Sequence, residues 1–383
     1  MQINTQEFAI STKRLFLCFA ALAGCASIDP PPAPAPAPPT ARVKLTNLVE
    51  DVASPGVSAD SHLVNPWGIA FSSTGALWVA DNHTGLATVY DGTGATIPLT
   101  VTIPTPANDV DLAAPTGQVF NSIANDFVGD TFILSTEDGT IAGWQSGTAA
   151  VLRADNSANG SVYKGLEMLD TGAGRVLSAA NFSKGTVDVF DTSYQPITLP
   201  GGDFIDPNPL PGFAPFNVLV AGDRVYVAYA KQDAALHDDI SGHGNGAINV
   251  FDKTGNFVSR LVTGETLDSP WGLAIAPTDY PVIGGDLLVG NFGDGRISAI
   301  DPLSGVLKTQ LEDEQGSPLV IPGLWALRFG ADQTAESHTQ IFFTAGPNGE
   351  SAGVLGRLDV AVPTPSGGGT TGGGHGGYGG YGY

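Results

Sequence analysis

Short hydrophobic runs that alternate with Gly, Pro, Asp and Asn make up most of this chain. The stretch 65–91 shows the pattern most fully, with Pro-Trp-Gly-Ile-Ala at 66–70, Leu-Trp-Val-Ala-Asp at 77–81 and Val-Tyr-Asp at 89–91. The pattern returns with variation in 269–301. Each copy predicts three short strands separated by turns. Because a unit of this size cannot bury its apolar faces alone, we expect the copies to stack on one another.

Six such units follow one another along the chain. Aligning them on their first strands, with that of the second unit at 122–127, gives spacings of 43 to 55 residues and one equivalent position per unit: Trp67, Asn121, Lys164, Phe216, Trp271 and Trp325. Periods near 50 residues with three or four strands are typical of propeller blades. The strand 43–49 has no partner of its own, and we expect it to complete the last unit. The sequence therefore predicts an all-β six-bladed β-propeller over 43–362.

Three phrases of the repeat resemble NHL-type repeats: Pro-x-Gly-Ile-Ala, Leu-Trp-Val-Ala-Asp-Asn and Val-Tyr-Asp. Residues 44–94 and 229–246 together resemble a family of secreted bacterial NHL-like propeller proteins. The resemblance extends over 43–360. It implies the six-bladed fold, closed by the N-terminal strand, and it implies no particular activity.

Composition and charge narrow the range of partners. The chain has 383 residues with 51 Gly and 28 Pro, which favours many short strands over long helices. Asp and Glu number 38 against 16 Lys and Arg, for a net charge of −22. A negative field repels nucleic acid and anionic lipid, so we expect neither as a partner. We also expect the protein to be a monomer.

The N-terminal segment has the order of a secretory signal. Lys13 and Arg14 precede an apolar run at 15–22, and Leu-Ala-Gly-Cys at 22–25 resembles a bacterial lipobox. We therefore predict a lipoprotein signal peptide over 1–24, lipid on Cys25, and an envelope location in the outer membrane, periplasm or cell surface. An ordinary secretory signal is the alternative. The Pro/Ala-rich segment 25–42 predicts an extended linker, and the Gly/Tyr-rich segment 363–383 predicts a disordered tail.

The six first-strand positions are candidates for ligand binding. In a propeller the first strands line the central channel, so their starting residues meet at one mouth. Three Trp and one Phe, with the amide of Asn121 and the ammonium of Lys164 between them, would suit a glycan, a peptide or a protein side chain. The alternative is that these aromatic rings pack as core.

The ends of the second strands supply polar side chains at the same mouth. Asp81, Asn181 and Asn291 alternate there with Ser135, Tyr229 and Ala345. Oxygen ligands around a ring suit Ca²⁺ or another divalent cation, although turn residues that bond their own backbone give the same pattern. Six-bladed Ca²⁺-dependent lactonases use an Asn in a Pro-Asn-Gly phrase. Here the phrase is Pro-Trp-Gly at 66–68 and 270–272, and an indole does not ligate Ca²⁺.

Two long insertions are expected on the same face as the mouth, at 200–215 and 230–246. Long loops in compact domains are often functional. The second insertion carries four residues that could bind a metal or set a histidine beside a carboxylate: His237, Asp238, Asp239 and His243. Ordinary solvated turns have the same composition, and no HExxH or CxxC spacing is present.

These features favour a non-catalytic binding propeller. Its tether would be a lipid at the envelope, and its mouth would recognise a protein, peptide or glycan. The alternative is a metal-dependent hydrolase or lactonase, for which the sequence offers no serine elbow, phosphate loop or cysteine nucleophile. A purely structural role is the third hypothesis. A propeller scaffold is compatible with all three.

Overall fold

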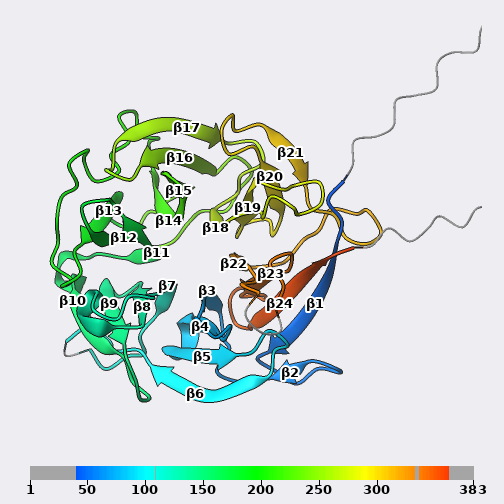
Figure 1. Ribbon diagram of the computed structural model, residues 1–383, viewed down its shortest axis with the longest axis horizontal. Coiled ribbons are helices and arrows are strands. Elements are labelled where there is room, and N and C mark those ends of the chain that lie inside the picture. Colours follow the sequence, from blue (N-terminus) through cyan, green and yellow to red (C-terminus); the bar gives the residue numbers. More distant parts are fainter. Residues whose placement is uncertain (1–39, 108, 333–335, 362–383) are drawn as a thin grey trace, which may run out of the picture. The chain divides into compact units, whose positions relative to one another are not determined.

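A computed structural model describes residues 40–107, 109–332 and 336–361. Within these residues there are six sheets of mainly antiparallel strands. Figure 1 shows that they are arranged in a ring around a common axis. The fold is the predicted all-β six-bladed propeller. The predicted signal peptide, Cys25, most of the linker and the Gly/Tyr-rich tail lie outside the described residues.

The first three blades occupy the chain in order from the innermost strand outward. Blade 1 contains β3 (Pro66–Phe71), β4 (Leu77–Asp81), β5 (Leu86–Tyr90) and β6 (Thr96–Thr102). Blade 2 contains β7 (Pro115–Phe120), β8 (Phe132–Thr136), β9 (Thr140–Trp144) and β10 (Val151–Asp155). Blade 3 has three strands, β11 (Tyr163–Asp170), β12 (Arg175–Asn181) and β13 (Thr186–Phe190). The only helical segments among the described residues are short 3-10 turns: η1 (Asn82–Thr84), η2 (Phe127–Gly129) and η3 (Ser157–Asn159).

The remaining blades complete the ring. Blade 4 contains β14 (Phe213–Ala221), β15 (Arg224–Lys231), β16 (Gly246–Asp252) and β17 (Phe257–Thr263). Blade 5 contains β18 (Pro270–Ile275), β19 (Leu287–Asn291), β20 (Ile297–Ile300) and β21 (Leu307–Gln310). Blade 6 contains β22 (Leu324–Phe329), β23 (Ile341–Ala345), β24 (Val354–Val360) and β1 (Val43–Glu50), with β2 (Ser58–Ala59) parallel to β1 at its edge.

The predicted closure of the ring is confirmed. β1 pairs antiparallel with β24, from Val43 opposite Val360 to Glu50 opposite Val354. The pairing covers an edge of β24 that would otherwise be open to other chains. Because β1 comes first in the chain and β24 last, the propeller is completed only when both ends are in place.

The Pro-x-Gly phrase of the repeat has a packing reason. A Cβ on Gly68 would lie 2.6 Å from the carbonyl oxygen of Thr116 in the next blade, and one on Gly272 would lie 2.6 Å from that of Trp325. First strands converge at the axis, so the residue that faces the neighbouring strand has no room for a side chain. The glycine therefore belongs to the scaffold.

This register corrects the alignment of the second blade. Its first strand is β7, at 115–120 and not at 122–127, and Pro115 pairs with Thr136 as Pro66 pairs with Asp81. Thr116 therefore takes the position that the sequence alignment gave to Asn121, and Thr136 takes that of Ser135. Pro-Thr-Gly at 115–117 repeats the phrase Pro-Trp-Gly, but the missing indole hid the match.

Five of the six pairs of neighbouring blades enclose a separate apolar cluster, and the cluster between blades 6 and 1 continues to the axis of the ring. Trp78 of blade 1 stacks on Phe132 of blade 2, with 4.0 Å between ring centroids. Corresponding clusters join blades 2 and 3, 3 and 4, 4 and 5, and 5 and 6. Truncating a buried aromatic ring to Ala costs about 3–5 kcal/mol of unfolding free energy. The apolar contacts that stabilise the fold are thus distributed around the ring.

None of the helices among the described residues is long and apolar enough to cross a membrane.

Candidate functional site

The three first-strand tryptophans fill the channel and do not face solvent. Trp67 stacks on Trp325 with 3.5 Å between ring centroids, and Trp271 meets both edge-on. The exposed fraction is 2 % for Trp67, 4 % for Trp271 and 1 % for Trp325. Phe216 and Phe292 extend the cluster, Phe292 stacking on Trp325. This aromatic plug corrects the expectation of an open stacking platform, because rings that cover one another have no face left for a ligand.

Asn121 lies away from the plug. It follows β7 and donates to the carbonyl oxygens of Asp126 and Asp130, at 3.1 and 2.8 Å. Its own oxygen accepts from Arg175. Asn121 therefore fixes the β7–β8 connection, at the end of the first strand opposite to the plug.

Lys164 is the first component of a polar cluster above the plug. It begins blade 3, is 2 % exposed, and its ammonium lies 5.3 Å from the centre of the Trp67 ring. Nζ donates to Glu137 and, at 3.0 Å, to Asp238. Burial alone lowers the pKa of Lys164, but the charges of Glu137 and Asp238 outweigh it and the pKa is raised. The ammonium therefore stays charged.

His237 and Asp238 come from the predicted long loop between β15 and β16. His237 Nδ1 lies 2.9 Å from Asp238 Oδ1, and the backbone N–H of His237 donates to Asp233 at 3.0 Å. This contact with His237 holds the pKa of Asp238 well below its usual range, and Lys164 acts in the same direction. The bond to Asp238 also raises the pKa of His237. The loop thus presents a histidine–carboxylate pair, as one reading of the sequence proposed.

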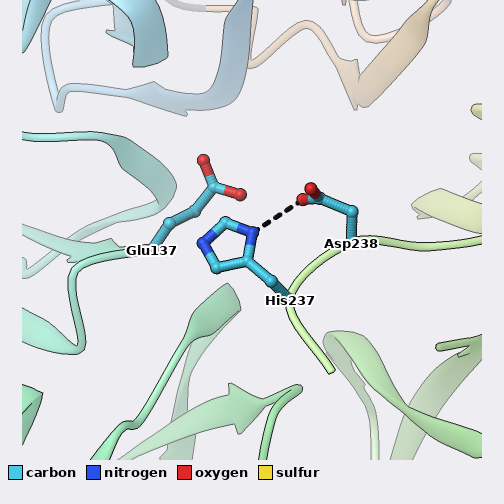
Figure 2. A group of neighbouring side chains, drawn as sticks. All are labelled: Glu137, His237 and Asp238. Carbon is cyan, nitrogen blue, oxygen red and sulfur yellow. Dashed lines mark hydrogen bonds and ion pairs between the residues drawn. The ribbon is translucent and has the colours of Figure 1, made fainter. Parts of the chain in front are cut away.

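Glu137, His237 and Asp238 form the one group of three potential metal ligands found among the described residues. Their ligand atoms all lie within 4.8 Å of one another. Figure 2 shows the three side chains directed toward one another. Glu137 comes from the turn between β8 and β9, so the group joins blades 2 and 4. Asp239 and His243, predicted alongside, are not members. Asp239 accepts from Ser241 at 3.4 Å, and His243 is exposed.

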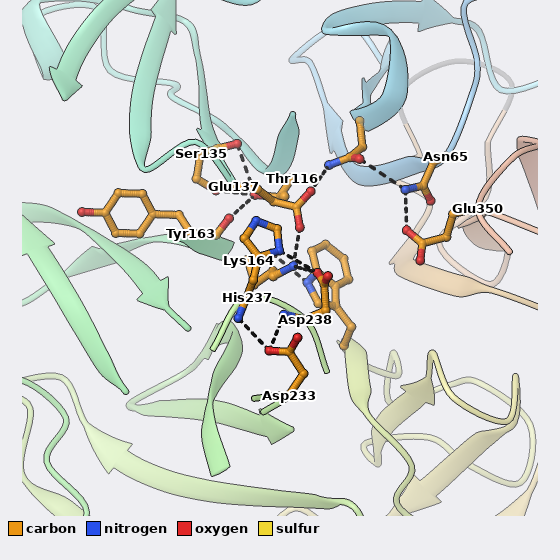
Figure 3. Close-up of polar contacts among 12 residues, drawn as sticks. Asn65, Thr116, Ser135, Glu137, Tyr163, Lys164, Asp233, His237, Asp238 and Glu350 are labelled. Atoms are coloured by element: carbon orange, nitrogen blue, oxygen red, sulfur yellow. Dashed lines mark hydrogen bonds and ion pairs between the residues drawn. The ribbon is translucent and has the colours of Figure 1, made fainter. Parts of the chain in front are cut away.

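Hydrogen bonds through the amide side chains of Asn82 and Asn65 link this cluster to blade 6. Asn82 donates to Glu137 at 2.8 Å, and Asn65 donates to Asn82 at 3.3 Å and to Glu350 at 2.7 Å. Asn65 also accepts from the indole of Trp325 at 2.9 Å, which anchors the chain to the plug. Figure 3 shows the contacts that run from Glu137 to Asn65 and Glu350, with Lys164, His237 and Asp238 beside them. These residues lie at the end of the channel where the first strands begin. We call this end, with Glu137, His237, Asp238 and Glu350, the loop mouth.

Asn65 owes its position to its backbone. It has φ of +48° and precedes Pro66, and Ser269 has φ of +49° before Pro270. Asn adopts this left-handed region more readily than most residues, and strained backbone of this kind is typical of functional sites. A Cβ on Gly346 would collide with the Asn65 oxygen, so the glycine leaves room for the amide.

Glu350 differs from the other carboxylates of the loop mouth. Burial raises its pKa, and the charge of Glu137 adds to the increase. Asn65, His83 and Lys164 only partly oppose this rise. Among the described residues no ion pair is found for Glu350, whereas Glu137 and Asp238 share Lys164. Glu350 is therefore a partly buried negative charge whose closest partner is a neutral amide.

The other predicted cation ligands do not meet. Asp81 accepts from Thr88 of its own blade at 2.8 Å, Asn181 donates to Asp188 of its own blade at 2.8 Å, and Asn291 donates to Thr266 and Asp294. Burial raises the pKa of Asp81 well above its usual value. Each of the three side chains therefore bonds to nearby residues, mostly to other side chains and not to its own turn backbone. Tyr229 and Ala345 are buried at the equivalent positions.

The insertion 200–215 is placed differently from expectation. Phe204 packs edge-on against Phe251 of blade 4, and Asp206 accepts from Asn249 and Arg260. This segment follows the three-stranded blade 3, and Phe204 and Asp206 contact β16 and β17 of blade 4. These two residues therefore pack on blade 4 and not at the loop mouth.

Sequence reasoning missed Glu137, Glu350, Asn65 and Asn82. Asn65 directly precedes the most regular Pro-Trp-Gly phrase, and Glu137, Asn82 and Glu350 all lie in turns between second and third strands. Those turns surround one mouth of a propeller, so scanning them for carboxylates and amides would have found Glu137, Asn82 and Glu350.

Comparisons with known proteins give relatives without an assigned activity. The chain is 30 % identical over 334 residues to "Uncharacterized protein R648" of Acanthamoeba polyphaga mimivirus, covering 82 % of this chain and 80 % of the relative. "Uncharacterized protein L690" of the same virus is 30 % identical over 332 residues, covering 82 % and 85 %. No protein-family model matches the chain. These relatives are viral, so they lend no support to the bacterial affiliation, and the NHL resemblance stays a prediction.

Solved structures with a similar fold include a streptogramin B lyase, with a TM-score of 0.48 and 14 % identity over 83 % of this chain and 97 % of that one. Another is BBS1N in complex with ARL6DN, with a TM-score of 0.43 and 15 % identity over 81 % and 83 %. One comes from a lyase and one from a protein complex. At such identities a shared fold leaves function undecided.

Proposed function

Because the chain belongs to the family of the mimivirus proteins R648 and L690, whose names state no activity, we propose a function from its own geometry. It is a non-catalytic binding propeller. Its loop mouth recognises a cationic side chain, Lys or Arg, of a peptide or protein partner. The observation that carries the proposal is the charge of this mouth, where Glu137, Asp238 and Glu350 surround a single Lys164.

The balance of charge leaves room for a second cation. Lys164 neutralises one of the three carboxylates and already contacts Glu137 and Asp238. His237, whose pKa is raised by Asp238, offsets that carboxylate further when it is protonated, so Glu350 carries the unbalanced charge. Asp238 remains 66 % exposed, and Glu350 has no ionic partner among the described residues. An ammonium or guanidinium group that enters between them would gain charge-assisted hydrogen bonds at a partly dehydrated site. The amide chain through Asn65 and Asn82 holds these oxygens in place before the ligand arrives.

A calorimetric titration tests this recognition. Peptides with a central Arg, and matched peptides with citrulline in its place, are titrated into the protein. We expect the Arg peptide to bind. Glu350→Gln should weaken this binding about tenfold, which corresponds to a loss of roughly 1.4 kcal/mol of binding free energy. The control is Asp223→Asn, a fully exposed carboxylate in the β14–β15 turn. Equal binding of Arg and citrulline peptides would refute the proposal.

A second candidate, a metal-dependent hydrolase, rests on the Glu137, His237 and Asp238 group. These donors suit a divalent cation, with Ca²⁺ less favoured than Zn²⁺ because one ligand is an imidazole. The ammonium of Lys164 contacts two of the three donors, and a metal would compete with it. Stoichiometric metal after dialysis, together with chelator-sensitive esterase or lactonase activity, would favour this candidate over the first.

We further propose that the protein is secreted and held at a bacterial envelope by lipid on Cys25. The motif at 22–25 supports this proposal. Mass spectrometry of membrane fractions should find an N-terminal peptide that begins with acylated Cys25. The variant Cys25→Ala should remain unprocessed or appear as a soluble protein. An unmodified Met1 terminus in the native protein would contradict the tether.

A further inference from the structure

The opposite half of the channel holds polar groups that the loop mouth does not use. Beyond the aromatic plug, residues from all six first strands line a small chamber of about 30 Å³, and residues from β3, β7, β11 and β22 line an open basin of about 290 Å³. Chamber and basin share Glu167 and Arg328 at their boundary. We call this end of the channel the far mouth.

Gln118 is a chamber residue whose side-chain amide lacks hydrogen-bond partners. Its side chain is 2 % exposed, and neither its Nε2 nor its Oε1 has a hydrogen-bond partner. A buried amide without partners costs free energy, and such groups are rare in folded proteins. Asn217, also in the chamber wall, is already bonded to the Trp271 carbonyl and to the backbone of Val218. Gln118 thus offers two donor hydrogens and one acceptor toward the chamber.

Glu167 and Arg328 add one charge of each sign. Arg328 Nη2 and Glu167 Oε2 are 3.8 Å apart, a separation too long for a hydrogen bond. Arg328 Nε donates to the Ile69 carbonyl, which fixes the plane of the guanidinium. Burial raises the pKa of Glu167, and Arg328 only partly opposes this rise. The two groups are close enough to attract each other and far enough apart to accept a ligand on both.

Apolar side chains surround this charged pair. Phe71, Phe120 and Phe329 line the basin, together with Ala70 and Val119. All five belong to first strands, so the wall is rigid. A ligand that suits the far mouth therefore has a small polar end with both charges and a short apolar body.

We infer that the far mouth binds a small zwitterion, an α-amino acid with an apolar side chain. Its carboxylate would bond to Arg328 and the Gln118 amide N–H, and its ammonium to Glu167 and the Gln118 oxygen. The side chain would lie among the three phenylalanines. The volume of the basin is at the lower end of the range for ligand pockets, which fits a ligand of this size.

Calorimetry with the full chain tests the inference, with L-leucine as ligand. N-acetyl-L-leucine lacks the ammonium, and L-leucinamide lacks the carboxylate. We expect L-leucine to bind, and each derivative to bind about tenfold more weakly or worse, since each leaves a buried group unpaired. Gln118→Leu should weaken L-leucine binding by at least a similar factor.

Two further measurements keep the test independent of folding and of the loop mouth. Circular dichroism should show Gln118→Leu folded as well as the parent, because the amide that it loses has no partner. Glu350→Gln should bind L-leucine unchanged, since Glu350 lies at the other mouth. If L-leucine does not bind, or if Gln118→Leu binds it normally, the inference is wrong. A crystal structure in which ordered water alone pairs with Gln118 despite soaked L-leucine would also overturn it.

Discussion

The two mouths of the channel are built from different parts of the repeat. The loop mouth takes its charged groups from turns between strands, and amides link them into one chain from Glu350 to Lys164. The far mouth takes its groups from the first strands, and its amide at Gln118 stays unpartnered. Turns can supply many polar side chains that hydrogen-bond to one another. The first strands converge at the axis, so they offer few positions for polar side chains that could pair in this way. A propeller can therefore carry a bonded charged surface at one end and a sparse, rigid pocket at the other.

Removing the plug between the mouths should have the largest effect. Trp325→Ala deletes a ring that stacks on Trp67 and Phe292 and donates to Asn65. We expect a loss of about 3–5 kcal/mol in the free energy of unfolding, measured by urea titration. A loss below about 1 kcal/mol, together with lost ligand binding, would instead support the open stacking platform expected from the sequence.

Lys164→Met tests the ion pairs of the loop mouth. The variant leaves Glu137 and Asp238 facing each other without their shared cation. Breaking one partner of a buried ion pair costs about 3–5 kcal/mol, and we expect the lower end because Asp238 is largely exposed. The double variant Glu137→Gln with Lys164→Met should regain part of the loss in urea titrations. Additive losses would show that the contact contributes little.

The pH dependence of cation binding should separate Glu350 from its neighbours. Its folded pKa lies above the ordinary value of 4.5, so it takes up a proton before Asp238 does as the pH falls. Because a protonated carboxyl does not attract a cation, affinity for the Arg peptide should fall while Asp238, whose pKa is depressed, is still ionised. Titrations between pH 4 and 8 should show this, and Glu350→Gln should flatten the curve. An unchanged curve in the variant would contradict it.

The same pKa shift has a consequence for stability. A carboxyl with a raised folded pKa makes the folded state less stable as the pH rises through its unfolded and folded pKa values. Glu350→Gln should therefore be more stable than the parent at pH 7, with the difference vanishing below pH 4.5. Thermal unfolding at both pH values measures the effect. Lower stability of the variant at pH 7 would show that the bond to Asn65 outweighs the burial of charge.

Gln118→Leu should have the smallest effect on stability. The far mouth gives this amide no partner, so replacing it by an apolar group of similar size removes no hydrogen bond. We expect a change within about 1 kcal/mol in urea titrations, in contrast to Lys164→Met at the loop mouth. A large loss would mean that ordered water or a neighbouring group pairs with Gln118 in solution.

Much of the fold could be predicted because its signals are local. Alternating apolar residues, turns and the Pro-x-Gly phrase recur in nearly every blade, and the unpartnered strand at 43–49 indicated the closure. Blade 2 was misaligned because Thr116 stands where other blades have an aromatic or a lysine. The glycine at 117 was the better guide, since the close approach of neighbouring strands requires it.

The sites were harder to predict because they combine residues from several blades. His237 and Asp238 were found as neighbours in one loop, but Glu137 joins them only through the ring. The tryptophans were placed correctly at one end of the first strands, yet their direction depends on contacts between blades 1, 5 and 6. The position of each tryptophan in its repeat predicts how far along the propeller axis its ring lies. Whether the ring faces solvent depends on packing between blades, which the sequence of one repeat does not reveal.

The pairing of Val43 with Val360 places the two ends of the folded domain side by side. A short designed linker could therefore join them, and new termini could be opened in a turn between two other blades. Such a circular permutant would keep every strand pairing while moving the seam of the ring. Comparing its refolding rate with that of the parent would tell whether the propeller assembles from its seam or from any blade.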